Sequence, residues 1–225
     1  MIEEFLECIY FTEAFTYYVY QNDSSDYILY RIDYNGKNKT EICTFKEPVL
    51  SFAVYQNKIL IVLLDENKEK ALLGEMDLSG KNLKIFDNIN PCITTIKYYK
   101  ARIYVNNGWL YYINEENENL CRVNLIDYNV EQVMNKKIGN INFTSKYLLY
   151  SNENSLYRMN TSGSSKLIRT IEAMGGDYKD VIAGMITQNE MLFFSYYSDY
   201  LITRIEMIDI DGKVLKKFKT TYYDK

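Results

Sequence analysis

The sequence contains no histidine, only two prolines and a single tryptophan. Without histidine, the Ser-His and Cys-His arrangements that activate nucleophiles are excluded, and so are nearly all histidine metal sites. The longest clean apolar run covers residues 59–64, far short of the ~20 residues that span a bilayer as a helix. We therefore expect no cofactor, no metal and no membrane span.

Charge of one sign is never concentrated in this chain. The net charge is −4, and the most basic stretch, VLKKFK at residues 214–219, is typical of one strand with alternating faces. A nucleic-acid-binding protein needs a basic face, so we expect no nucleic-acid partner. The N-terminal MIEEFLECIY lacks the basic segment and long apolar core of a secretory signal. It favours a cytoplasmic protein, or an extracellular or cell-surface one if the sequence is a fragment.

The four cysteines are Cys8, Cys43, Cys92 and Cys121, and no two of them form a C-x-x-C pair. The common zinc spacings are therefore absent. The spacing favours one small apolar residue in each of several strands, as reduced buried thiols. A disulfide in an exported protein is the alternative.

What the chain does contain is tyrosine and a repeat. There are 23 Tyr and 10 Phe, and flat or β-branched side chains fit a half-buried pleated surface. An apolar stretch, a polar turn, a second apolar stretch and a turn with Gly or Asn recur about five times, with a mean spacing of about 44 residues. Examples are ILIVLLDENKEKALLGEMDLSG at 59–80 and MLFFSYYSDYLITRIEMIDIDG at 191–212.

This period is typical of propeller blades of four strands each. We predict an all-β protein, a β-propeller with five four-stranded antiparallel blades, in one domain over residues 1–225; an incomplete six-bladed ring is the alternative. The predicted blades cover residues 7–43, 49–86, 99–134, 138–169 and 180–220. The one irregular place is the stretch IEAMGGDYKD at 171–180, which we read as an inserted loop.

The segments WLYYINEENENLCRVNL (109–125) and YILYRIDYNG (27–36) resemble the YWTD-type repeat of the low-density-lipoprotein-receptor propellers. They are still more similar to a bacterial domain family of unknown function built on that pattern. The chain departs from the receptor repeat in three ways. It has five repeats where the receptor propellers have six blades, only Trp109 keeps the motif tryptophan, and Asn114 and Asn152 replace the motif aspartate.

Acidic residues suggest two further sites. Five-bladed propellers also host glycoside hydrolases, which need two carboxylates reaching a central cavity; the only acidic candidates on the predicted inner strands are Glu7 and Asp180. Aspartates before glycine at Asp33, Asp77, Asp209 and Asp211 suggest calcium ligands, but no segment supplies a complete calcium-binding loop. We expect these aspartates to close turns instead.

Arginines recur on the predicted third strands, at Arg31, Arg122, Arg158 and Arg204. We interpret them as architectural, bonding to loop carbonyls or to an acid of a neighbouring blade, with an anion-binding ring as the alternative.

Tyrosines gather in predicted loops and strand ends, where they stack on sugars or anchor protein partners. The binding candidates are Tyr196, Tyr197, Tyr200, Tyr98 and Tyr99. We predict a non-enzymatic scaffold that presents one propeller face to a protein or peptide ligand, by analogy at the level of the fold. A carbohydrate-binding propeller, with or without weak glycoside hydrolase activity, is the alternative.

Overall fold

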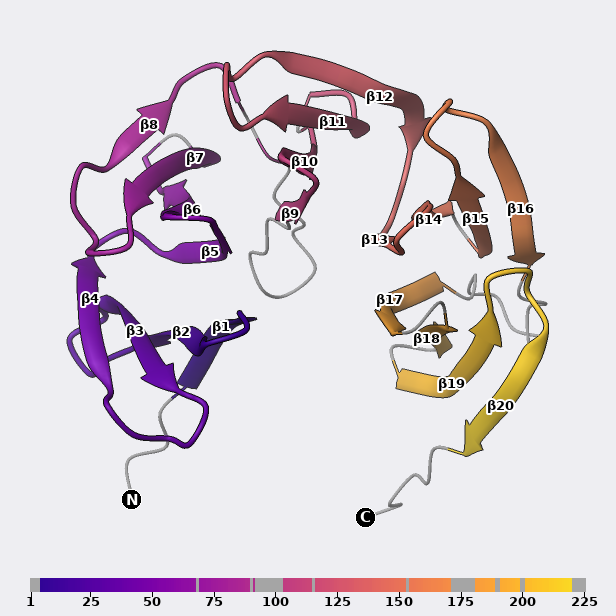
Figure 1. The fold of residues 1–225 in the computed structure, drawn as a ribbon, viewed down its shortest axis with the longest axis horizontal. Coiled ribbons are helices and arrows are strands. Elements are labelled where there is room, and N and C mark those ends of the chain that lie inside the picture. The colour runs from indigo at the N-terminus through magenta and orange to yellow at the C-terminus, as the bar shows by residue number, and fades with distance from the viewer. Residues whose placement is uncertain are drawn as a thin grey trace. The chain divides into compact units, whose positions relative to one another are not determined.

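The computed structural model describes residues 5–67, 69–89, 91, 103–114, 116–152, 154–170, 181–188, 191–198 and 201–219. Throughout this part of the chain the regular elements are β-strands, which form five four-stranded sheets (Figure 1). Consecutive strands pair antiparallel in each sheet. The prediction of an all-β chain with five four-stranded antiparallel blades is confirmed.

The strands follow the chain in order, four to a sheet. Sheet 1 contains β1 (Phe5–Phe11), β2 (Phe15–Gln21), β3 (Tyr27–Asp33) and β4 (Thr40–Phe45). Sheet 2 contains β5 (Val49–Tyr55), β6 (Lys58–Asp65), β7 (Lys70–Asp77) and β8 (Lys84–Phe86). Sheet 3 contains β9 (Ile103–Asn106), β10 (Trp109–Ile113), β11 (Asn119–Asn124) and β12 (Val130–Lys137). Sheet 4 contains β13 (Ile141–Phe143), β14 (Leu148–Asn152), β15 (Ser155–Met159) and β16 (Ser165–Thr170). Sheet 5 contains β17 (Val181–Gln188), β18 (Met191–Ser198), β19 (Leu201–Asp209) and β20 (Val214–Lys219).

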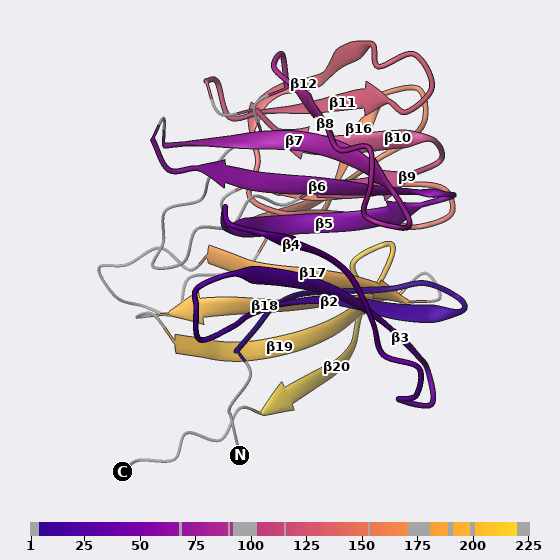
Figure 2. The same cartoon turned by 90° about the vertical axis from the view of Figure 1, so that its left-hand side faces the viewer.

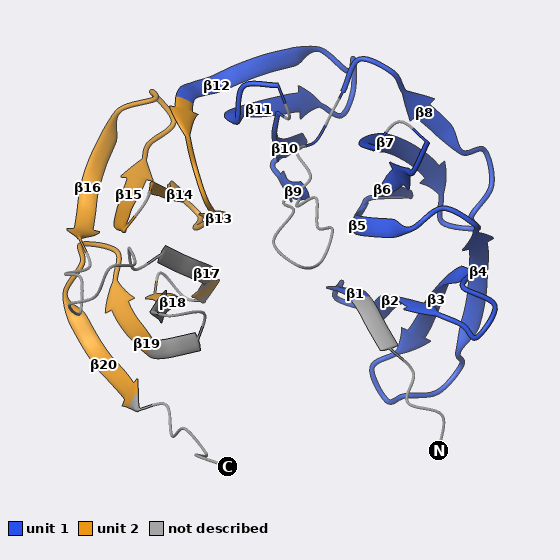
Figure 3. Cartoon of the chain, turned by 180° about the vertical axis from the view of Figure 1, so that it is seen from behind, with its two compact units in different colours: residues 1–135 blue, residues 136–225 orange. Residues whose placement is uncertain are grey.

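The chain divides into two compact units, residues 1–135 and 136–225 (Figure 3). The first unit holds sheets 1, 2 and most of 3, and the second holds sheets 4 and 5. The expectation of one domain over residues 1–225 stays a prediction, and so does the incomplete six-bladed ring. The irregular stretch at 171–180 lies outside the described residues.

The longest apolar run of the sequence, residues 59–64, lies in strand β6 and is explained by burial on both faces of the strand. Successive side chains of a strand point to opposite faces, so a strand covered on both sides is apolar throughout. In β6, which lies between β5 and β7 (Figure 2), every side chain from residue 59 to residue 64 is buried. Ile59, Ile61 and Leu63 belong to the core shared with sheet 1. Leu60, Val62 and Leu64 belong to the core shared with sheet 3.

Each unit is therefore held by apolar contact between neighbouring sheets. Tyr17, Val19 and Leu29 of sheet 1 pack against sheet 2, and Leu110 and Tyr112 of sheet 3 pack against its other face. In the second unit, residues of sheets 4 and 5 form a smaller core, consisting of Leu149, Leu156, Met185, Leu192 and Ile208. Fully burying one such side chain contributes about 1.5–3 kcal/mol, so these cores dominate the stability of each unit.

The turns between the third and fourth strands of sheets 1, 2, 4 and 5 share one backbone hydrogen-bond pattern. In sheet 2 the Asp77 amide donates to the Lys81 carbonyl, and the Gly80 amide donates to the Asp77 carbonyl. The Asp77 carboxylate also accepts hydrogen bonds from the amides of Ser79 and Lys81. Gly80 has φ +76°, a left-handed conformation that favours glycine. The predicted turn role of Asp77 is confirmed.

Two of these turns touch the outer strand of the preceding sheet. A Cβ added at Gly80 would lie 2.6 Å from the Ile42 carbonyl oxygen on β4. A Cβ added at Gly212 would lie 2.3 Å from the Ile168 carbonyl oxygen on β16. Real Cβ atoms do not approach this closely, so both glycines allow the backbones of two sheets to meet.

Replacing Gly80 by alanine should destabilise the protein more than the same change at Gly36. The two residues have nearly the same positive φ (+76° and +74°), but a Cβ at Gly36 would meet nothing within 4 Å. Both changes carry a backbone cost of about 1–2 kcal/mol, and Gly80→Ala adds overpacking of about 1–3 kcal/mol. Thermal unfolding should place the Gly80 variant several degrees lower, and equal melting temperatures would contradict the contact between sheets.

Asp77 should stabilise its turn in a pH-dependent way. Hydrogen bonds from the Ser79 side chain, the Lys81 backbone and other neighbours lower the pKa of the Asp77 carboxyl to about 2. A lowered pKa gives a stabilisation that is complete above the unfolded value of about 4 and is lost as pH falls through 2. The melting temperature of Asp77→Ala should therefore lie below that of the wild type at pH 7, by a margin that narrows below pH 4.

Asp77→Asn is the matched control, because Asn160 closes the same turn in sheet 4 with the same two backbone hydrogen bonds. The control should keep most of the stability of the wild type at pH 7. A pH-independent difference between wild type and Asp77→Ala would argue against a charged acceptor.

Candidate functional site

The predicted binding tyrosines fall on two segments of the chain. Tyr98, Tyr99 and Tyr200 lie outside the described residues. Tyr196 and Tyr197 lie on β18. Tyr196 is opposite Arg204 on β19, whereas Tyr197 is opposite Ile202, so the register slips by one residue between the two tyrosines.

This register slip is specific to sheet 5. In the other four sheets, the described pairs of second and third strands run without interruption. Bulges of this kind re-aim side chains and are over-represented at rims and next to active sites. The backbone of sheet 5 therefore departs from the pattern of the other sheets at Tyr196 and Tyr197, two of the residues that the sequence predicted to bind a ligand.

The two candidate catalytic carboxylates have different outcomes. Asp180 lies outside the described residues. Glu7 lies on β1 at a register slip between Leu6 and Cys8. The same slip occurs on β5, between Val49 and Ser51, and on β17. The backbone irregularity at Glu7 is therefore a feature of the repeat, and a catalytic pair stays a prediction.

The arginines do not all occupy one position. Arg31, Arg122 and Arg158 each lie two residues before the Asp or Asn that begins the turn to the fourth strand. Arg204 lies five residues before Asp209, so its assignment to this position was wrong. Glu75 and Met207 hold the position in sheets 2 and 5. Like β3, β11 and β15, β19 contains one arginine, and this suggested that Arg204 occupies the same position as the other three. The strand register shows that it does not.

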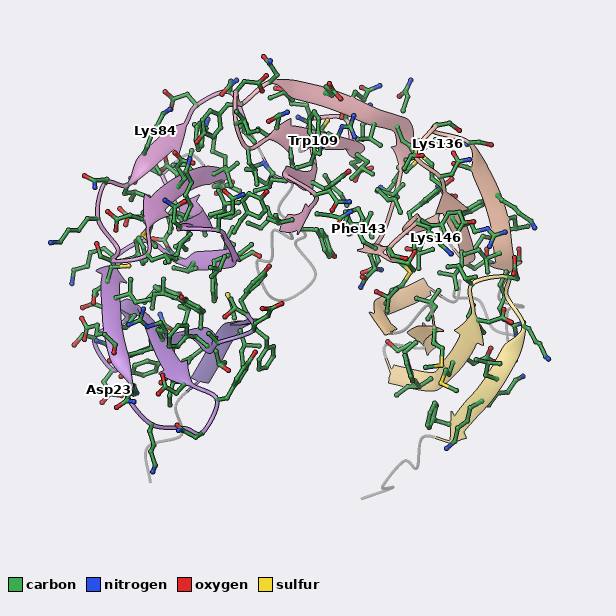
Figure 4. All side chains as sticks on the ribbon, in the orientation of Figure 1. Asp23, Lys84, Trp109, Lys136, Phe143 and Lys146 are labelled. Carbon is green, nitrogen blue, oxygen red and sulfur yellow. The ribbon has the colours of Figure 1, made fainter. Side chains whose placement is uncertain are left out.

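At this position each arginine lies over an aromatic ring at the start of the neighbouring second strand, or, for Arg158, one residue before it. The guanidinium carbon lies 4.7 Å from the ring centroid for Arg31 on Phe15. The distance is 3.9 Å for Arg122 on Trp109; the side chain of Trp109 is labelled in Figure 4. It is 4.9 Å for Arg158 on Tyr147. Such contacts stabilise by about 0.5–1 kcal/mol at partly exposed sites. The motif tryptophan is thus one member of a repeated pair of a cation and an aromatic ring.

Arg158 also joins two sheets. Its guanidinium donates to the Ile210 carbonyl at 3.1 Å, and it forms an ion pair with Asp211 at 2.9 Å. Both partners lie in the turn between β19 and β20. Arg122 instead pairs with Glu131 of its own sheet at 2.7 Å. The architectural interpretation is confirmed for Arg158, which bonds to a loop carbonyl and an acid of the neighbouring sheet.

Sheet 2 uses the opposite charge at the arginine position. Glu75 pairs with Lys58, which replaces the aromatic residue at the start of the second strand, with Nζ and Oε2 3.1 Å apart. The Tyr128 hydroxyl, from the turn after β11, donates to Glu75 at 2.5 Å and accepts from Lys58 at 2.7 Å. The hydrogen bond with Tyr128 is the main cause of a raised pKa at Lys58. The three side chains link sheet 2 to sheet 3.

A buried carboxylate links the sheets of the second unit. Glu206 on β19 is buried and lies 3.0 Å from the Arg169 guanidinium of β16 and 3.4 Å from Nζ of Lys217 on β20. A buried charge of this kind requires paired partners, because its desolvation costs several kcal/mol. The sequence alone did not single out this residue, since LITRIEMIDI has one acid on each face, Glu206 and Asp209.

Asp209 and the cysteines are further candidates from the sequence. The Asp209 carboxylate accepts hydrogen bonds from the amides of Asp211 and Lys213, which confirms its turn role. Among the described residues, no group of three His, Cys, Asp or Glu is placed to hold a metal ion. Cys43 and Cys121 are free thiols, the Cys8 thiol donates to the Val49 carbonyl with Sγ and O 3.7 Å apart, and Cys92 lies outside the described residues. Burial raises the pKa of Cys43 to about 12. No described helix is long and apolar enough to cross a membrane.

No protein-family model and no curated protein matches the chain. Solved structures do match it. A chain from a nidogen/laminin complex aligns with 13 % identity over 96 % of this chain and 81 % of its own length, with a TM-score of 0.65. A protein described as a putative TolB from Agrobacterium tumefaciens aligns with 10 % identity over 96 % and 82 %, with a TM-score of 0.63.

A structure from a study of two prolyl endopeptidases aligns over 95 % of this chain but only 34 % of that protein, with 10 % identity and a TM-score of 0.61. Identities this low show a shared fold and nothing more. The fold is that of a β-propeller, and the neighbours include propellers of the YWTD and TolB types.

Replacing Tyr128 by phenylalanine should weaken the link between sheets 2 and 3. The change keeps the ring, which lies 4.8 Å from the Phe86 ring centroid, and removes only the hydroxyl that joins Glu75 and Lys58. Loss of a hydrogen bond to a partly buried charged group costs about 1.5–3 kcal/mol. Tyr34→Phe is the control, because Tyr34 is 59 % exposed. Urea unfolding that cannot separate the two variants would contradict this account.

Proposed function

We propose that this chain is a non-enzymatic scaffold that presents one end of its sheets to a protein or peptide ligand. The slip of register at Tyr196 and Tyr197 carries the proposal, because it interrupts a strand pairing that is regular in the four other sheets. An irregularity confined to one repeat is typical of a site added to a fold. Tyrosine supplies large contact area with few rotatable bonds, which suits a binding surface.

Two further observations support the proposal. The absence of histidine removes the commonest general base, so an acid–base or nucleophilic mechanism would need other groups. One of the matching structures quoted above is that of a complex between two proteins, nidogen and laminin. We also propose kinship with the bacterial YWTD-like domain family, supported by the propeller neighbours and by residues 109–125.

A pull-down with matched variants tests the proposal. Tagged wild-type chain, the double variant Tyr196→Ala/Tyr197→Ala and the control Tyr34→Ala are incubated with extract of the native cells. Tyr34 is the control because it is exposed and lies in the turn after β3, which belongs to the other compact unit. The double variant should lose at least about tenfold in recovered partner, as expected when two aromatic anchors are removed, and the control should not.

The fold of each variant is checked by circular dichroism and thermal unfolding. Equal recovery by a folded double variant would contradict a ligand site at these tyrosines. A glycan array run in parallel separates the two ligand classes. A selective glycan signal without any recovered protein would replace the proposed ligand by a carbohydrate.

A further inference from the structure

Sheet 1 has an aromatic face turned away from sheet 2. Tyr17, Val19 and Leu29 belong to the core with sheet 2. Because side chains alternate along a strand, Tyr18, Tyr20 and Tyr30 lie on the opposite face. Tyr18 is directly across from Tyr30, and their ring centroids lie 5.5 Å apart with an interplanar angle of 26°. Tyr20 stacks on the same ring at 6.0 Å. We call these three residues the tyrosine ladder.

The ladder already holds a cation from the same chain. Nζ of Lys39 lies 4.1 Å from the ring centroid of Tyr30, 5.5 Å from that of Tyr18 and 5.9 Å from that of Tyr20. Lys39 lies just before β4 and is exposed. An ammonium over three ring faces is the geometry by which aromatic surfaces recognise cationic groups. One flexible lysine thus shows which charge this face accepts.

The surroundings of the ladder add a negative charge and apolar area. Glu41 on β4 is the register partner of Tyr30, so its side chain is on the same face, and its charge is one cause of the raised pKa of Tyr30, after burial. Ile9 on β1 is the partner of Tyr18, and Phe11 is the partner of Thr16 on the same face. These two apolar side chains are 46 % and 64 % exposed.

We propose that this face binds an extended peptide segment in which a lysine or arginine lies beside apolar residues. In the complex the basic group takes the place of Lys39 over the ladder and next to Glu41, and the apolar residues cover Ile9 and Phe11. The face offers aromatic rings and a carboxylate together, which suits a basic group and repels an acidic one. The net charge of −4 also favours a basic partner.

This inference rests on the proposed function, because it names a second surface of the same scaffold and the chemistry of its ligand. Lys39 acts in it as an internal competitor. Its long, flexible side chain reaches the rings from the connection before β4, not from a strand of the sheet. A ligand must displace it, and removal of Lys39 should therefore strengthen binding.

A fluorescence-anisotropy titration tests the inference. The probes are a fluorescein-labelled peptide of alternating lysine and leucine and a matched peptide of alternating glutamate and leucine. The wild type should bind the lysine peptide and not the glutamate peptide, with an affinity that falls as salt is raised. Lys39→Ser should bind several-fold more tightly, and Tyr30→Leu roughly fivefold more weakly, because the central ring of the ladder is lost.

Tyr34→Leu is the matched control, since Tyr34 is an exposed tyrosine outside the ladder, and it should bind like the wild type. Equal affinity of wild type, Lys39→Ser and folded Tyr30→Leu, or equal binding of the two peptides, would overturn the inference. So would light scattering that shows self-association through this face, lost in Tyr30→Leu, because the occupant is then a second copy. The pull-down with Tyr196→Ala/Tyr197→Ala reports on β18 alone, so a failure here leaves that result intact.

Discussion

Inside each unit the sheets have apolar faces that must be covered, and the cover is the next sheet along the chain. The turn between the third and fourth strands is where this contact becomes specific. Gly80 and Gly212 bring a turn against the backbone of the preceding sheet, whereas Tyr128 reaches back from its turn to Glu75 and Lys58. The apolar cores supply most of the stability. The turns fix how one sheet is placed on its neighbour.

Most of the architecture was predictable from the sequence, because the repeat, the alternation and the turn glycines all indicate the same structure. The continuous apolar run of β6 and its burial on both faces are one example. The register within each strand pair was not predictable at the level of single residues. Arg204 shows this, since it resembles the other arginines in sequence and lies three residues from their position. A bulge shifts register without leaving a sign in composition.

The candidate sites were only partly visible in the sequence. Tyr196 and Tyr197 attracted attention as a pair of adjacent tyrosines, and the register slip between them is a fact of the backbone alone. The tyrosine ladder was missed, because Tyr18, Tyr20 and Tyr30 are ordinary strand tyrosines until pairing places them on one face. Lys39 then lies over all three rings. Reading the alternation on β2 against that on β3 would have found the ladder.

The replacement of an aromatic ring and an arginine by Lys58 and Glu75 in sheet 2 has a wider consequence. Three sheets combine an aromatic ring with arginine at the equivalent place, and sheet 2 combines lysine with glutamate. Neither residue type is required by itself, as long as its neighbour complements it. Divergence between copies can then proceed by paired replacements that leave the backbone unchanged. An alignment that compares the repeats one position at a time therefore underestimates how closely they are related. An alignment that compares the two paired positions together retains this relationship.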